Sequence, residues 1–248
     1  MLFTLQALVL DKDKVNEIDY LVELLTTKGR LRVLAKGAQK SKRRFLNLLE
    51  DLTLIRCHLR RPQKGKTLIL ESADLLYIPE SPRRDLVKFY FFSYLAETMK
   101  QTFYAPLGSE EFNFVIQYLK ILDQEAWQEG FKTIWEYMCL KFNGLEPYLE
   151  GCVRCGERPK RIFYFSPQAG GILCFQCRDE RARPLEQFQI DLLRKIGRIK
   201  KAEEIFEPLE ALESERGREV QGFLEEFFLY HIDWEPRALR ILKEALHG

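Results

Sequence analysis

Four of the six cysteines in this sequence lie in two pairs within one short segment. Two residues separate Cys152 from Cys155 and Cys174 from Cys177, and eighteen residues separate the two pairs. This C-x2-C-x18-C-x2-C spacing is typical of a tetrahedral zinc site with four thiolate ligands, because each short turn presents two sulfurs to one ion. A degenerate or oxidised cluster and a redox pair are the alternatives.

A zinc ion bound by these four cysteines would be structural. A catalytic zinc has three protein ligands and an open position for water, whereas four thiolates close the coordination shell. Residues 151–177 contain no histidine, and we interpret the nearby Glu157 and Asp179 as surface charges. We therefore expect one structural Zn²⁺, which stabilises a segment too small to bury a core of its own.

Basic residues are concentrated in a second segment. The net charge is only +2, yet thirteen Lys or Arg and two acidic residues lie between Lys28 and Lys66, which leaves −9 for the rest. Residues 36–46 are predicted to form a mobile loop, in which Phe45 either stacks on a base or anchors the loop in the core. Such a loop beside basic strand faces favours contacts with nucleic-acid phosphates over a merely solvated surface. The residues predicted to contact nucleic acid are Arg30, Arg32, Lys36, Lys40, Lys42, Arg43, Arg44, Arg56, Arg60, Lys64 and Lys66.

The basic residues lie on predicted β-strands. Five apolar-rich runs precede residue 79, at about 3–10, 18–26, 30–37, 52–59 and 67–75. In the third and fourth runs, apolar residues alternate with basic-type residues, which predicts one buried and one exposed face. Five short strands in about 75 residues predict a small barrel of the OB type, residues 1–79.

Helical periodicity replaces the strand pattern after the barrel. Helices are predicted at 83–103, 109–124, 126–143, 184–198, 215–232 and 235–247, with Ser81 and Pro82 as the start signal of the first. The fold class is therefore α+β, with a helical domain at 80–150 and 179–248 that carries the cysteine segment, 151–178, as an insertion. Within this segment RIFYF is strand-like and Ser166-Pro167 with Gly170-Gly171 mark a turn, which predicts a zinc ribbon.

We find no sign of an enzyme. The three histidines are scattered, and no Ser-His-acid order or histidine metal motif occurs. The letters KGKT at 64–67 resemble the end of a phosphate-binding loop, but Arg60 stands where that motif requires its first glycine. We therefore expect no nucleotide site.

The N-terminal apolar run does not read as a targeting segment. MLFTLQALVL lacks a preceding positive region and a small-residue cleavage site, and the aromatic run at 88–99 is too short and polar to span a bilayer. We expect no membrane partner and a location in the cytoplasm, a compartment in which paired cysteines more often bind metal than form disulfides.

Three stretches of the sequence resemble the bacterial RecO family of recombination mediators. NEIDYLVELLTTKGRLRVLAKGAQKSKRRF is similar to its second and third strands and basic loop, and LTLIRCHLRRPQKGKTLILESADLL to the next two strands. FKTIWEYMCLKFNGLEPYLEGCVRCG, with GGILCFQC, is similar to the helix and zinc segment that follow. The helices after about residue 184 rest on periodicity alone.

The resemblance implies a specific activity. RecO-family proteins bind single- and double-stranded DNA, anneal complementary strands, and work with RecR to load RecA onto DNA coated by single-strand-binding protein (SSB), without ATP. The resemblance also implies association with the nucleoid and binding of the SSB C-terminal tail by the helical domain, at residues that we leave unassigned. The alternative is a zinc-ribbon and OB scaffold that binds RNA or protein in a transcription or translation assembly.

Overall fold

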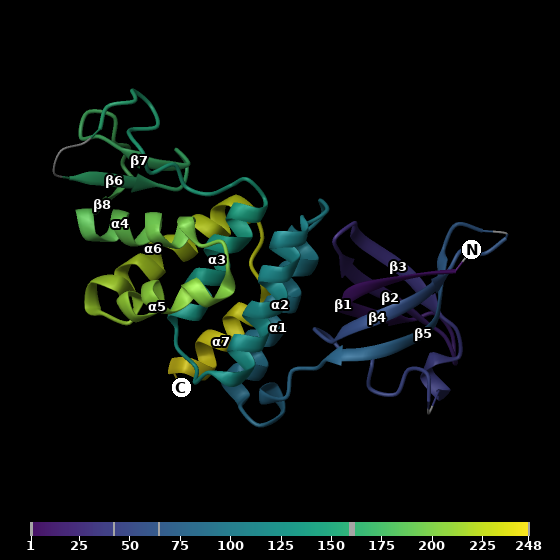
Figure 1. Cartoon of the computed structure of the whole chain (residues 1–248). Helices are drawn as coiled ribbons and strands as arrows, with labels where there is room; N and C mark the ends of the chain where they lie inside the picture. The colour runs from purple at the N-terminus through teal and green to yellow at the C-terminus, as the bar shows by residue number, and fades with distance from the viewer. Residues whose placement is uncertain (1, 42, 64, 159–161, 248) are drawn as a thin grey trace. The chain divides into compact units, whose positions relative to one another are not determined.

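The computed structural model describes residues 2–41, 43–63, 65–158 and 162–247 (Figure 1). The chain forms two compact units, one of residues 1–124 with 240–248 and one of residues 125–239. The first unit thus includes helices as well as the barrel, whereas the expected domain boundary lay at residue 79. Within the described ranges, none of the helices combines the length and apolar character that a bilayer crossing requires.

The N-terminal strands close into a barrel, which confirms the predicted OB-type fold. The strands are β1 (Leu2–Lys14), β2 (Tyr20–Thr26), β3 (Gly29–Ala35), β4 (Leu54–Arg60) and β5 (Leu68–Tyr77). Their order around the barrel is β1-β2-β3-β5-β4, with β1 also paired to β4. All pairs are antiparallel except β3 with β5, whose short parallel contact closes the barrel.

Alternation along the strands builds the barrel core as predicted. Val33 and Ala35 of β3 are buried with Ile55, Cys57 and Leu59 of β4, while the residues between them point outward. Burial of these apolar side chains is the main stabilising contribution to the barrel.

The connection between β3 and β4 is more ordered than the predicted mobile loop. It contains a 3₁₀ turn, η1 (Ala38–Lys40), in which Ala38 is buried. Phe45 is only 4% exposed and belongs to the barrel core, so it anchors the loop and does not present its ring to a base.

Two helices follow the barrel in the first unit. After the 3₁₀ turn η2 (Ser81–Arg83), α1 spans Leu86–Thr102 and α2 spans Ser109–Gln124. The expected start signal at Ser81 and Pro82 forms the 3₁₀ turn, and Asp85 caps α1 by accepting a hydrogen bond from the Lys88 backbone N–H at 3.0 Å. The Asp85 carboxylate marks the start of α1 because it accepts a hydrogen bond from a first-turn backbone N–H that has no partner within the helix.

Helices also form most of the second unit. They are α3 (Gly130–Phe142), α4 (Gln187–Arg198), η3 (Ala202–Ile205), α5 (Phe206–Leu212) and α6 (Glu215–Ile232); α7 (Arg237–His247) begins in this unit and ends in the first. Helix α3 is buried along nearly its whole length and packs against α6. Helix α5 was not predicted, because seven residues are too few for a clear period of 3.6.

The cysteine segment and the residues directly after it form a small three-stranded sheet. Its strands are β6 (Phe163–Ser166), β7 (Gly171–Leu173) and β8 (Arg183–Leu185), in the order β7-β6-β8. The β6–β7 hairpin agrees with the predicted ribbon. Strand β8 was missed, because three residues that include a proline carry no alternation signal.

Candidate metal centre and nucleic-acid interface

The fold brings the four predicted metal ligands together. The Sγ atoms of Cys152, Cys155, Cys174 and Cys177 all lie within 4.8 Å of one another, and those of Cys155 and Cys174 are 3.8 Å apart. Four sulfurs at about 2.3 Å from a tetrahedral zinc are separated by about 3.8 Å. The donor set and its spacing therefore fit one closed-shell metal ion.

Backbone geometry shapes the first cysteine turn. The Cys152 N–H donates to the Glu157 carbonyl at 2.8 Å, and the Gly156 N–H donates to the Cys152 carbonyl at 2.8 Å. Gly156 has a φ of +75°, a conformation that favours glycine and lets the chain close the turn directly after Cys155.

Hydrogen bonds favour the thiolate at the first ligand. Burial acts to raise the pKa of the Cys152 thiol, but bonds from the backbone of Cys174, Cys155 and Arg154 outweigh it and lower the pKa to about 6. Metal binding requires the deprotonated sulfur, so this environment prepares the ligand.

Asp179 has a structural role that the sequence interpretation missed. Its carboxylate accepts a hydrogen bond from the Ser166 hydroxyl at 2.8 Å and lies 3.4 Å from the Arg154 guanidinium, with 19% of its side chain exposed. Asp179 therefore ties strand β6 to both cysteine turns and is not simply a surface charge. Glu157 is exposed, as expected.

The predicted DNA-binding residues are mostly exposed on the barrel. Lys42 and Lys64 lie outside the described residues. Arg30 is half-buried, and the exposed members of the set are Arg32, Lys36, Lys40, Arg43, Arg44, Arg56, Arg60 and Lys66.

Part of this set gathers where β3 and β5 pair in parallel. Arg44 donates to the Lys36 carbonyl at 3.2 Å and to the Glu71 carbonyl at 3.5 Å, and Arg60 pairs with the Glu71 carboxylate. The β3–β4 loop is thus fastened to β5, and Arg44 of the loop and Arg60 of β4 both contact Glu71 of β5. We call Lys36, Arg44, Arg60 and Lys66, with Lys40 and Arg43 of the loop, the basic face.

Free cations are the part of the basic face best suited to bind phosphate. Among the described residues, Lys40, Arg43 and Lys66 form no ion pair, and neither does Arg61, which directly follows β4. Arg61 was not in the predicted set, although the letters RRPQKGK placed it in the same basic connection. An unpaired cation neutralises a phosphate without first giving up a protein carboxylate.

Arg30 has a different environment from the rest of the set. Its side chain is 19% exposed, pairs with Glu23, donates to the Lys100 carbonyl in α1, and stacks 5.2 Å from the centre of the Tyr104 ring. This residue therefore links the barrel to the helices of the first unit, whereas its neighbour Arg32 is 65% exposed.

Other polar groups on the barrel surface form cross-strand links. The Thr4 hydroxyl lies 3.0 Å from His58 Nδ1, and His58 Nε2 lies 3.1 Å from the Asp74 carboxylate. This hydroxyl–imidazole–carboxylate chain joins β1, β4 and β5. Thr4 and His58 are 54 residues apart and His58 and Asp74 are 16 apart, so no short sequence motif could show it.

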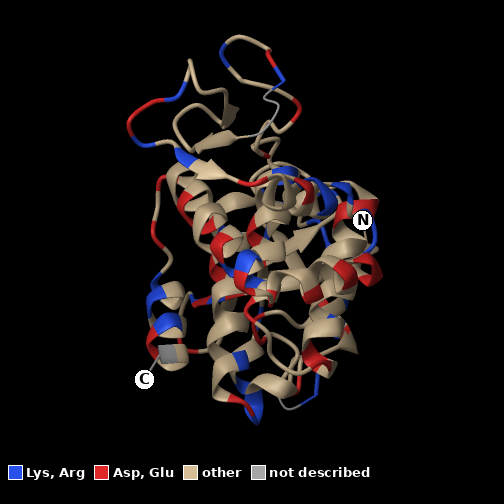
Figure 2. Cartoon of the chain, turned by 90° about the vertical axis from the view of Figure 1, so that its left-hand side faces the viewer, with Lys and Arg blue, Asp and Glu red and all other residues tan. Residues whose placement is uncertain are grey.

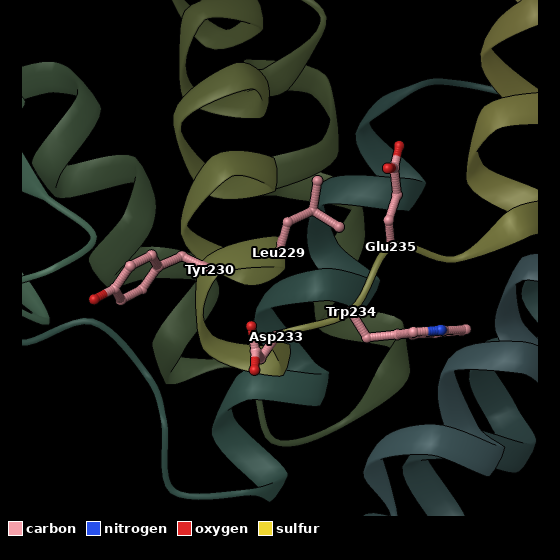
Figure 3. Close-up of a pocket in the computed structure, with 5 residues that line it drawn as sticks. All are labelled: Leu229, Tyr230, Asp233, Trp234 and Glu235. Atoms are coloured by element: carbon pink, nitrogen blue, oxygen red, sulfur yellow. The ribbon is translucent and has the colours of Figure 1, made fainter.

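The second unit contains a cavity of about 740 Å³ at the end of α6 (Figure 3). Leu229, Tyr230, Asp233, Trp234 and Glu235 line it, and the Tyr230 and Trp234 rings point in opposite directions. Two carboxylates and no basic residue make this lining unsuited to phosphate.

Comparison with known proteins decides the family. The model described as "Recombination protein O N terminal" matches residues 1–77, and the model described as "Recombination protein O C terminal" matches residues 83–240. The chain belongs to the RecO family.

Individual RecO proteins agree with this assignment over most of their length. The DNA repair protein RecO of Anaeromyxobacter sp. (strain Fw109-5) is 31% identical over 247 residues, which cover 97% of this chain and 95% of the relative. The DNA repair protein RecO of Thermoanaerobacter sp. (strain X514) is 27% identical over 194 residues, with 76% and 77% covered. The match to RecO of Myxococcus xanthus (strain DK1622) is 29% identical over 241 residues, with 96% of each chain covered.

Proposed function

We propose that this RecO-family protein is a DNA repair and recombination mediator that binds single- and double-stranded DNA. In this proposal it anneals complementary strands and, with RecR, helps to load RecA onto SSB-coated DNA in the cytoplasm, near the nucleoid. Family membership over both parts of the chain is the observation that carries the proposal.

The basic face supplies a physical mechanism for annealing. Two DNA strands repel one another through their phosphates, and a surface that neutralises several phosphates lowers this repulsion. Contacts to phosphates read no sequence, so any pair of complementary strands can use the same surface. No covalent step and no nucleotide are needed, and we propose that the protein acts without catalysis.

Zinc is the metal that best suits the cysteine cluster. Four thiolates in a tetrahedral arrangement favour zinc over oxygen-seeking cations, and zinc has no redox chemistry of its own. Cys152, Cys155, Cys174 and Cys177 would bind it and hold the β6–β7 hairpin to both cysteine turns. The RecR surface and the site of the SSB tail remain proposals without assigned residues.

A strand-annealing assay with and without SSB tests the proposal. We expect the protein to accelerate annealing of bare and SSB-coated oligonucleotides, and the log–log salt dependence of single-strand binding to have a slope on the order of −4 if five or six cations engage. Binding of structured RNA or a protein partner, with no acceleration of DNA annealing, would favour the alternative scaffold function and contradict the proposal.

A further inference from the structure

An exposed aromatic and arginine cluster lies beside the cysteine site on the small sheet. The Arg178 guanidinium lies 3.8 Å from the centre of the Phe175 ring and 5.2 Å from that of Tyr164. Arg178 also donates to the Tyr164 hydroxyl at 3.1 Å, and the two rings are 6.2 Å apart. We call these three residues the ribbon platform.

The exposure of Phe175 is not explained by packing. The ring follows Cys174 directly in the second cysteine turn and is 63% exposed, and it is not part of the small core around Leu173. Leaving an aromatic ring of this size in water forgoes the stabilisation that burial provides. The turn that binds metal therefore presents a flat apolar surface to the solvent.

The segment that carries the ribbon platform has a small excess of basic residues. The described residues of 151–183 include five arginines and three acidic residues, and Figure 2 shows both kinds on the loops of the small sheet, at the top of the view. Asp179 is already engaged by Arg154 and Ser166. The local charge is thus positive, in contrast to the −9 of the chain outside 28–66.

We propose that the ribbon platform is a second contact for single-stranded nucleic acid, in which an unpaired base stacks on Phe175. Arg178 covers part of the ring and places its charge where the phosphate next to a stacked base lies, with Arg154 nearby. Aromatic rings joined with arginines are the usual means of binding single strands without sequence preference. This inference rests on the proposed function, since it adds a contact to the same DNA-binding activity.

The open position of the Phe175 ring favours a nucleobase over a peptide side chain as its ligand. An apolar peptide residue gains most of its affinity from a concave pocket that encloses it. Neither the cavity at the end of α6 nor the one lined by Glu150, Arg158, Phe163, Gln187 and Arg194 includes Phe175, whose ring is 63% exposed. A nucleobase needs only one flat face for stacking, so the single strand is the occupant that the geometry favours.

The test compares Phe175→Ala with Phe175→Trp in the full-length, zinc-loaded protein. The ligands are an oligothymidine and an oligonucleotide of equal length and charge that lacks bases. We expect Phe175→Ala to weaken oligothymidine binding about fivefold to tenfold and Phe175→Trp to retain it. Binding of the abasic strand should be the same in all three proteins, because it offers nothing to stack. Phe188→Ala, at a 38% exposed ring in α4, is the matched control and should bind like wild type.

Several outcomes would overturn the inference. It fails if Phe175→Ala binds oligothymidine as wild type does, or loses affinity equally for the abasic strand. It also fails if this variant binds DNA normally but loses an acidic, Phe-ended peptide, which would make the platform a protein contact. If Phe175→Ala fails to retain zinc, Phe175→Leu decides by the same comparison, because leucine preserves apolar volume without a stacking face. Wild-type protein that binds no DNA would instead refute the proposed function.

Discussion

Arg44 and Lys36 are joined by a hydrogen bond from the arginine guanidinium to the lysine carbonyl, 3.2 Å long, across the base of the β3–β4 loop. The Arg44 guanidinium also lies 5.2 Å from the centre of the Phe45 ring, which is buried in the barrel. One charged residue of the loop therefore holds its shape, while Lys40 and Arg43 are free to bind a ligand.

The free cations of the loop should determine the salt dependence of DNA binding. Lys40→Gln with Arg43→Gln removes two phosphate contacts, so the slope for single strands should become shallower by about 1.4. Fluorescence anisotropy of a labelled oligonucleotide at several salt concentrations measures the slope. Lys195→Gln with Arg216→Gln removes two exposed cations that pair with Glu207 and Glu186, and should leave the slope unchanged. An unaltered slope in the loop variant would show that the loop is only solvated surface.

Phe45 should stabilise the barrel and not contact DNA directly. Phe45→Ala removes a ring that is 4% exposed and should cost about 3 kcal/mol of barrel stability, whereas Leu46→Ala, at a residue that is 59% exposed, should cost less than about 0.5 kcal/mol. Hydrogen exchange of the β3 and β4 amides reports on the barrel alone. Equal protection in both variants would contradict the anchoring role.

Substitution of Arg30 should mainly reduce stability, whereas substitution of Arg32 should mainly reduce DNA binding. Arg30→Gln leaves Glu23 without its nearest partner, at a site where that side chain is 11% exposed, and should cost about 1–3 kcal/mol. Arg32→Gln changes an exposed residue 3.6 Å from the same carboxylate, so stability should stay within about 0.5 kcal/mol. We expect Arg32→Gln to weaken DNA binding more than Arg30→Gln does. DNA affinity and thermal melting are measured for both variants. The opposite order would place Arg30 on the binding surface.

Metal removal should expose the four cysteines of the cluster selectively. Metal analysis of freshly purified, reduced protein should give one zinc per chain, and the Cys152→Ala, Cys174→Ala double variant should contain none. Burial raises the pKa of the Cys57 thiol to about 12, so this residue should remain unreactive at neutral pH after chelation. Thiol titration before and after chelation should therefore detect the four cysteines of the cluster. DNA binding by the barrel should persist after chelation. Unchanged metal content in the double variant would contradict the site.

His231 should make the second unit less stable in mild acid. Its ring lies 4.2 Å from that of Phe227, and burial lowers its pKa below the usual 6.5, while a hydrogen bond to the Pro167 backbone acts in the opposite direction. The unfolded chain thus binds a proton more readily than the folded one. The stability present above pH 6.5 is lost as the pH falls from 6.5 towards the lower folded pKa.

The difference in urea midpoint between wild type and His231→Gln isolates this histidine from the acid sensitivity of the cysteines. We expect this difference to change between pH 7.5 and pH 5.5, because the urea midpoint of wild type should fall more than that of His231→Gln. A difference that does not vary with pH would show that His231 does not titrate differently on folding.

Local patterns in the sequence predicted much of the fold. Ile55, Cys57 and Leu59 alternate with basic-type residues, and Val33 and Ala35 lie two residues apart on the buried face of β3. This period of two by itself separates the barrel core from its surface. The spacing of the four cysteines likewise predicted their convergence, because a two-residue gap brings two sulfurs together within a single turn.

Contacts between distant residues required the tertiary structure. Arg30 and Arg32 belong to the same basic run, yet only the approach of the Lys100 carbonyl and the Tyr104 ring makes Arg30 an internal link. Whether Phe45 stacks on a base or anchors the loop depends on what its ring contacts in the folded barrel. In the same way, only the folded ribbon places Arg178 on the ring of Phe175. Residue type and period describe a side chain's own strand or turn, whereas burial and pairing depend on chain segments that only folding brings within a few ångströms.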